Sequence, residues 1–109
     1  MVYIDTHCHL NLFPNQNDLV SVIKRSLDLG VTKIVIPGID LLTSRRAVEL
    51  SETFPSVFAA VGVHPHEVTN YTDDDIKVIE DLAVLPKVVA IGEIGLDYHY
   101  TPINKDAQK

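Results

Sequence analysis

The chain has 109 residues, of which 46% are hydrophobic and 22% are charged, and this balance is typical of a folded globular domain rather than a disordered segment. Its formal net charge of −6 opposes non-specific attraction to nucleic acid or anionic membranes, so a phosphate-bearing substrate would need a local positive centre. The longest apolar run, residues 57–63, is far shorter than the roughly 20 residues of a membrane-spanning helix. We therefore expect one domain spanning residues 1–109, with no membrane partner.

The only cysteine is Cys8, and a single cysteine excludes an internal disulfide framework. The first ten residues contain an aspartate and two histidines instead of the basic and apolar segments of a secretory leader. Both features fit a reducing compartment. We therefore expect a cytoplasmic protein.

Four short runs rich in valine and isoleucine recur along the chain, at residues 2–6, 33–37, 57–63 and 88–92. They are nearly continuously apolar rather than alternating, which is typical of strands in a parallel sheet that is covered on both faces. The sequence therefore predicts four buried parallel strands.

Segments with helical spacing of apolar residues separate these strands, at residues 18–29, 42–54 and 73–83. Gly30 follows the first segment as a C-terminal stop, and Thr72 precedes the third as an N-terminal cap. Strands and helices that alternate in this way indicate an α/β fold with right-handed crossovers.

Two architectures fit this alternation, a doubly wound sheet and a (β/α)₈ barrel. A complete barrel takes about 250 residues, so this chain could supply roughly half of one. The polar segment after residue 92 stops as if the next helix had just begun. The pattern alone does not choose between the two architectures.

A histidine pair follows the first predicted strand, in the order Asp5, Thr6, His7, Cys8, His9. In an extended segment side chains alternate, so His7 and His9 should point to one side and Cys8 to the other. Imidazole nitrogen binds Zn²⁺ and related metals, and sites in such folds gather at the C-terminal ends of strands. We therefore expect a metal site, with Asp5 orienting an imidazole or binding substrate. A pair of core histidines is the alternative.

Glu93 directly follows the fourth predicted strand and lies between Gly92 and Gly95. A carboxylate at the edge of a core is costly unless a metal or a buried partner compensates its charge. Its two oxygens can bridge two ions about 3.5–4 Å apart, as in two-metal phosphoester hydrolysis. Glu93 is therefore the strongest candidate for a catalytic metal ligand.

Two more histidines, His64 and His66, follow the third predicted strand, and Asp97 follows Glu93 in the same loop. The histidines could bind substrate, coordinate a metal or hold the loop, and Asp97 could contact substrate or cap its loop. We expect His64, His66 and Asp97 to lie beside the metal site as substrate-binding residues.

Four motifs together resemble the TatD family of metal-dependent deoxyribonucleases: DTHCHL at 5–10, PGID at 37–40, GVHPH at 62–66 and EIGLDYH at 93–99. The resemblance implies the N-terminal half of a (β/α)₈ TIM barrel of the amidohydrolase-like type. It also implies two divalent metal ions (Mg²⁺, Zn²⁺ or Mn²⁺), DNA as substrate, and 3′–5′ exonuclease action on phosphodiester bonds.

Residue by residue, the resemblance places the family's first metal pair on His7 and His9 and its bridging carboxylate on Glu93. The family also uses two histidines on later strands and a late aspartate, for which these 109 residues contain no counterpart. Activity of this chain alone is therefore in doubt.

Two other functions remain open. A related barrel hydrolase could act on small esters or amides, because a His-x-His motif opens those sites too. The chain could instead be a catalytically incomplete metal-binding fragment. Its open sheet edges would then favour self-association.

Overall fold

A computed structural model describes residues 1–100 and 104–109. One parallel sheet contains four strands in the order of the sequence: β1 (Tyr3–Asp5), β2 (Val31–Pro37), β3 (Val57–Val61) and β4 (Val88–Ile91). The α-helices are α1 (Gln16–Asp28), α2 (Leu41–Thr53), α3 (Asp73–Ala83) and the short α4 (Lys105–Gln108), and two 3₁₀ helices are η1 (Leu10–Leu12) and η2 (Val68–Asn70).

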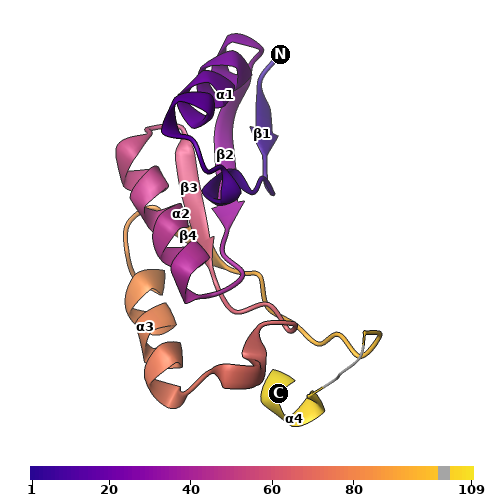
Figure 1. Ribbon diagram of the computed structural model, residues 1–109. Coiled ribbons are helices and arrows are strands. Elements are labelled where there is room, and N and C mark those ends of the chain that lie inside the picture. Colours follow the sequence, from indigo (N-terminus) through magenta and orange to yellow (C-terminus); the bar gives the residue numbers. More distant parts are fainter. Residues whose placement is uncertain (101–103) are drawn as a thin grey trace.

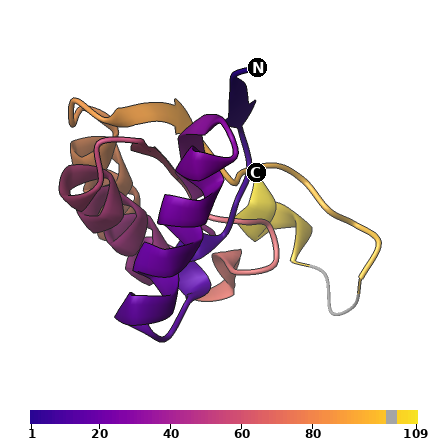
Figure 2. The same ribbon diagram turned by 90° about the horizontal axis from the view of Figure 1, so that it is seen from above.

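Helices α1, α2 and α3 lie on one face of the sheet (Figures 1 and 2). The strand order has no reversal, whereas a doubly wound sheet reverses its order and carries helices on both faces. The arrangement is therefore half of a (β/α)₈ barrel, and the predicted fold class is confirmed.

The hydrophobic core fills the space between the sheet and these helices. The strands β2 and β3 contribute Ile34, Ile36 and Val57 to it, and the helices contribute Leu19 and Leu50, each at most 2% exposed. The central strands are thus buried as predicted.

The outer strands differ from the prediction, which expected all four to be buried. Ile4 in β1 is 55% exposed, and Val89 and Ile91 in β4 are 55% and 53% exposed. The reason is that β1 and β4 are the edges of the sheet, each paired with one strand among the described residues. Continuous apolar sequence indicates burial only where a neighbouring strand or a covering layer is present.

Some of the observed strand and helix bounds also differ from those predicted from the sequence. The predicted strands 2–6 and 57–63 are shorter in the structure, ending at Asp5 and Val61, so both histidine pairs lie in loops. The first helix begins at Gln16, because the Asn15 side chain accepts a hydrogen bond from the Asn17 amide and caps it there. The third helix and its Thr72 cap are as predicted.

Within residues 1–100 and 104–109, no helix has both the length and the apolar content needed to cross a membrane.

Candidate metal centre and the adjoining pocket

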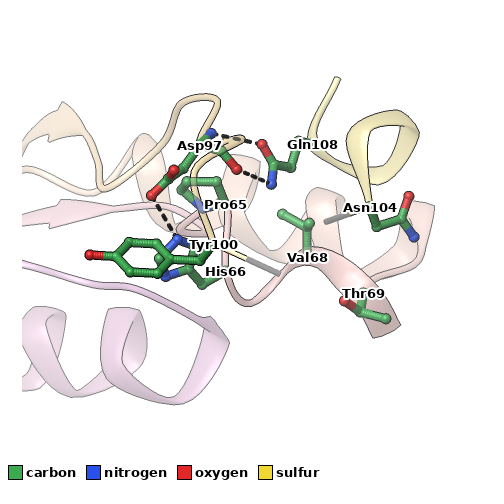
Figure 3. Close-up of a pocket in the computed structure, with 8 residues that line it drawn as sticks. All are labelled: Pro65, His66, Val68, Thr69, Asp97, Tyr100, Asn104 and Gln108. Atoms are coloured by element: carbon green, nitrogen blue, oxygen red, sulfur yellow. Dashed lines mark hydrogen bonds and ion pairs between the residues drawn. The ribbon is translucent and has the colours of Figure 1, made fainter. Parts of the chain in front are cut away.

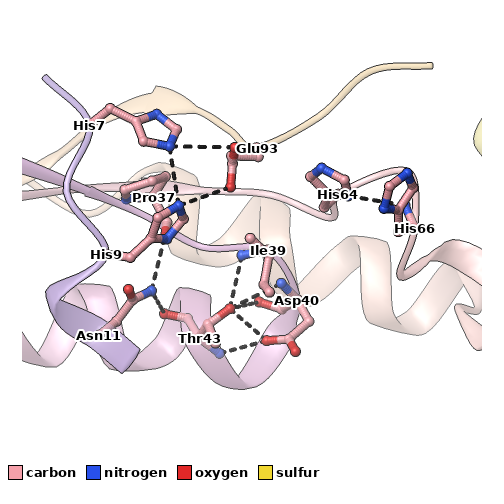
Figure 4. Close-up of polar contacts among 10 residues, drawn as sticks. All are labelled: His7, His9, Asn11, Pro37, Ile39, Asp40, Thr43, His64, His66 and Glu93. Carbon is pink, nitrogen blue, oxygen red and sulfur yellow. Dashed lines mark hydrogen bonds and ion pairs between the residues drawn. The ribbon is translucent and has the colours of Figure 1, made fainter. Parts of the chain in front are cut away.

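Three side chains converge at the C-terminal edge of the sheet, His7 and His9 from the loop after β1 and Glu93 from the loop after β4 (Figure 4). The Nε2 atoms of the two histidines are 3.1 Å apart. The His7 Nε2 lies 3.5 Å from Glu93 Oε1, and the His9 Nε2 lies 3.5 Å from Glu93 Oε2. The structure thus brings together all three residues that the sequence singled out as metal ligands.

These separations fit a common cation. Two ligands bound to Zn²⁺ at about 2.0–2.1 Å with tetrahedral angles lie about 3.3–3.4 Å from each other. The three observed separations, 3.1, 3.5 and 3.5 Å, fall around that value. Two imidazoles and a carboxylate are also a donor set that catalytic zinc sites use. The side chains present can therefore hold a divalent ion without large rearrangement.

Glu93 is placed by the backbone around it. Its amide donates a 2.6 Å hydrogen bond to the carbonyl of Gly38, which follows β2. A Cβ atom on Gly62, which follows β3, would lie 2.8 Å from the Glu93 carbonyl oxygen, so only glycine permits this approach. The Ser44 hydroxyl of α2 lies 3.2 Å from both the amide nitrogen and the carbonyl oxygen of Gly62. The ends of β2, β3 and β4 are thereby held together under Glu93.

The histidines converge for a reason other than strand alternation, because β1 ends at Asp5. The Cys8 amide donates to the Val35 carbonyl at 3.1 Å, and the Cys8 side chain packs against the core. Burial, followed by the charge and hydrogen bond of Asp5, raises the pKa of the Cys8 thiol. The Asp5 carboxylate accepts a hydrogen bond from the His7 backbone amide at 3.1 Å. Its two expected roles, orienting an imidazole or binding substrate, stay predictions.

Asn11 supports the site and was missed in the sequence, where it is simply a polar residue between Leu10 and Leu12. Its buried amide group donates to the carbonyls of Pro37 at 2.8 Å and Thr43 at 3.1 Å (Figure 4). These bonds tie the turn that follows His9 to β2 and α2. Two buried atoms here, His9 Nδ1 and Asn11 Oδ1, have no hydrogen-bond partner within the part of the chain that the structure describes.

The second predicted group, His64, His66 and Asp97, lies apart from this cluster. The His66 Nε2 is 2.7 Å from Asp97 Oδ2, and the His64 Nδ1 accepts from the His66 amide at 3.1 Å. Among the described residues these side chains do not join a cluster of metal-ligating atoms. His66 and Asp97 form a pair, and His64 holds the turn that presents His66.

Two hydrogen bonds keep the Asp97 carboxyl ionised. The His99 amide donates to its Oδ1 at 2.9 Å, and this bond, followed by the hydrogen bond from His66, lowers the pKa of Asp97 below its ordinary value. An ionised carboxylate only accepts, so the His66 Nε2 donates to it.

A pocket of about 290 Å³ opens beside this pair (Figure 3). Asp97 and Gln108 both line the pocket and are joined by two hydrogen bonds. The Asp97 amide donates to the Gln108 Oε1 at 2.8 Å, and the Gln108 Nε2 donates to the Asp97 carbonyl at 2.9 Å. The lining consists of Pro65, His66, Val68, Thr69, Asp97, Tyr100, Asn104 and Gln108. No sequence pattern connects Tyr100, Asn104 and Gln108 with His66, because only the tertiary fold brings these residues together.

Asn11→Ala should lower the free energy of unfolding by about 1–3 kcal/mol, because it removes two buried hydrogen bonds, to the carbonyls of Pro37 and Thr43. Asn17→Ala, at an exposed position of α1, is the matched control and should change it by less than about 0.5 kcal/mol. Urea unfolding followed by circular dichroism measures both. Equal stability of the two variants would contradict the supporting role of Asn11.

The Asp97 carboxyl should titrate below the ordinary value of about 3.9, as measured by NMR on its side-chain carbon. Its folded pKa is lowered, so its stabilising contribution is present above the unfolded pKa and is lost as the pH falls through the folded pKa. His66→Ala should raise the midpoint only part of the way, because the His99 amide remains. A midpoint at or above the ordinary value in the parent chain would contradict this arrangement.

Comparison with known proteins gives consistent results. The family profile described as "TatD related DNase" matches residues 4–109. The chain is 44% identical over 105 residues to the "Uncharacterized metal-dependent hydrolase YabD" of Bacillus subtilis, covering 96% of this chain and 41% of YabD. It is 41% identical over 85 residues to the "3'-5' ssDNA/RNA exonuclease TatD" of Musicola paradisiaca, covering 77% of this chain and 32% of that protein.

A solved structure gives the same result for the fold. The crystal structure of YjjV, a TatD homologue from Escherichia coli K12, superposes with a TM-score of 0.79 at 32% sequence identity. The match covers 97% of this chain and 40% of YjjV. The chain thus spans about two fifths of the length of YabD and of YjjV. Family profile, sequence identity and fold agree, and the chain belongs to the TatD family.

Proposed function

We propose that the protein, in its full-length form, is a metal-dependent hydrolase of phosphodiester bonds in DNA. The observation that carries this proposal is the convergence of His7, His9 and Glu93, whose facing atoms are 3.1–3.5 Å apart. Side chains of this kind, accessible at the end of a barrel strand, are typical of a catalytic site rather than of a structural core.

In this proposal both histidines bind one shared ion through Nε2, and Glu93 is the catalytic ligand that joins that ion and would bridge it to a second. A carboxylate has two oxygens, so the one not used on the first ion would be available to the second. A histidine that coordinates through Nε2 keeps its proton on Nδ1, and the Nδ1 of His9 is a buried atom without a hydrogen-bond partner among the described residues. The ions, of which Mg²⁺, Zn²⁺ and Mn²⁺ are the candidates, would activate water and neutralise charge on the phosphate.

Charge gives a second argument for bound ions. The chain has a net charge of −6, which would repel a polyanionic substrate. Divalent ions at Glu93 would invert the local field where a phosphate must approach. Substrate attraction would then depend on metal and be confined to this edge of the sheet.

The substrate class is proposed from the relatives. Several of them are named 3'-5' ssDNA/RNA exonucleases, so we infer exonuclease action on single strands. His66, held by Asp97 and presented by His64, is the proposed contact to the strand beside the metal centre. The cytoplasmic location expected from the sequence stays a prediction.

Hydrolysis of a small ester or amide is the rival function, since YabD is named a metal-dependent hydrolase with no substrate attached. A second alternative is that the chain is a metal-binding fragment without catalytic activity. Three ligands shared between two ions would hold each weakly, so the 109-residue chain by itself should bind metal but turn over slowly.

The direct test uses Glu93→Gln in the full-length form, with release of nucleotides from single-stranded DNA as the readout. The rate should fall by about a hundredfold or more, because metal binding supplies several kcal/mol of transition-state stabilisation. Asp74→Asn removes the same charge at an exposed position in the first turn of α3 and should leave the rate within about twofold.

Isothermal titration of the 109-residue chain with Mn²⁺ or Zn²⁺ supplies the binding readout. His7→Ala and Glu93→Gln should each weaken uptake by about tenfold or more, whereas Asp74→Asn should not. DNA hydrolysis that survives Glu93→Gln would overturn the site. Turnover of small esters but not of DNA would favour the alternative function, hydrolysis of a small ester or amide.

A further inference from the structure

The pocket lined by His66 and Asp97 also carries an exposed aromatic residue. Tyr100 meets the ring of His66 edge-to-face, with centroids 5.2 Å apart and planes at 85°. Tyr100 is nevertheless 61% exposed, and its ring lies beside that of His66 (Figure 3). An accessible ring held by a neighbour is a suitable platform for stacking a flat ligand.

The polar groups of the pocket suit a neutral ligand. The Asp97 carboxylate has both oxygens engaged, by His66 and by the His99 amide, so neither oxygen is left without a hydrogen-bond donor. Asn104 uses its Oδ1 to accept from the Ala107 amide at 3.0 Å, which leaves its NH₂ group as a donor. The Thr69 hydroxyl can both donate and accept.

The lining lacks the groups that bind phosphate. Among its described residues there is no lysine and no arginine, and its one formal charge is negative. A phosphate would therefore meet repulsion from Asp97 without a compensating cation. A planar group with hydrogen-bonding edges meets no such penalty.

The size and position of the pocket further restrict the class of ligand that it could bind. The volume of about 290 Å³ is at the lower end of small-molecule sites, which run from about 300 to 1,000 Å³, and is enough for a single heterocycle. His66 and Asp97 follow β3 and β4, at the same edge of the sheet as Glu93. A ligand in the pocket would therefore lie on the same edge of the sheet as a phosphate at the metal centre.

From these observations we propose that this pocket binds one unpaired base of a single-stranded nucleic acid, with Tyr100 as the stacking platform and Asn104 and Thr69 at the edge of the base. The proposal rests on the proposed function and extends it. It accounts for binding of single strands by an acidic chain, since stacking on an aromatic ring does not require a basic groove. A base held in a duplex could not enter such a pocket.

The test is an NMR titration of the 109-residue chain with deoxyadenosine in the presence of EDTA, so that neither a phosphate nor a metal contributes. The side-chain amide signals of Asn104 and Gln108 should shift in a saturable way. Tyr100→Ala should weaken binding about tenfold, within the range found for loss of one stacked base, and Tyr100→Phe should weaken it by less than about twofold.

Tyr98→Ala is the matched control, because the Tyr98 ring lies in the same loop, 4.9 Å from the Lys105 Nζ, and does not line the pocket. It should leave the affinity within about twofold, and circular dichroism checks that each variant is folded. The proposal is overturned if deoxyadenosine causes no saturable shift, if 2-deoxyribose 5-phosphate causes the same shift, or if Tyr98→Ala weakens binding as much as Tyr100→Ala. Binding of deoxyadenosine with no metal-dependent hydrolysis of DNA would refute the proposed function and leave the base site standing.

Discussion

The close approach of three strand ends is the constraint on which the site depends. Gly62, which follows β3, has no side chain, so the backbone at Glu93 can approach it closely. In this position the Glu93 amide donates a hydrogen bond to the carbonyl of Gly38, which follows β2. The Ser44 hydroxyl of α2 also contacts the amide nitrogen and the carbonyl oxygen of Gly62, which fixes the position of this glycine. Without this convergence the Glu93 carboxylate would not reach two imidazoles that come from the other end of the sheet order, after β1.

The same constraint explains how charge is distributed at this edge. The proposed metal centre gathers one carboxylate and two imidazoles, and the Asp97 carboxylate near the same edge is hydrogen-bonded to His66. A divalent ion would thus add a strong positive charge at Glu93, on the same edge of the sheet as a pocket whose lining has no lysine or arginine among the described residues. The two places suit the two parts of a nucleotide, a phosphate at Glu93 and a base at Tyr100.

Much of this could be predicted from the sequence, because it follows from local rules. Alternating strands and helices indicated an α/β fold, the motifs that resemble the TatD family indicated the half-barrel, and polar residues directly after apolar strands marked His7, His9 and Glu93. What could not be predicted depends on neighbours far away in the chain. Burial of β1 and β4 requires strands on both sides, and a self-association of two half-barrels through those edges stays a prediction. The roles of Asn11 and Tyr100 require knowing which carbonyls and rings lie opposite them.

The central claim is that His7, His9 and Glu93 share a cation, and a crystal structure of the protein soaked with Mn²⁺ or Zn²⁺ tests it most directly through anomalous scattering. The account predicts an anomalous peak about 2.0–2.2 Å from the Nε2 atoms of the histidines and from a Glu93 oxygen. Ordered rings and carboxylate with no peak between them, or a peak bound only by other residues, would contradict it.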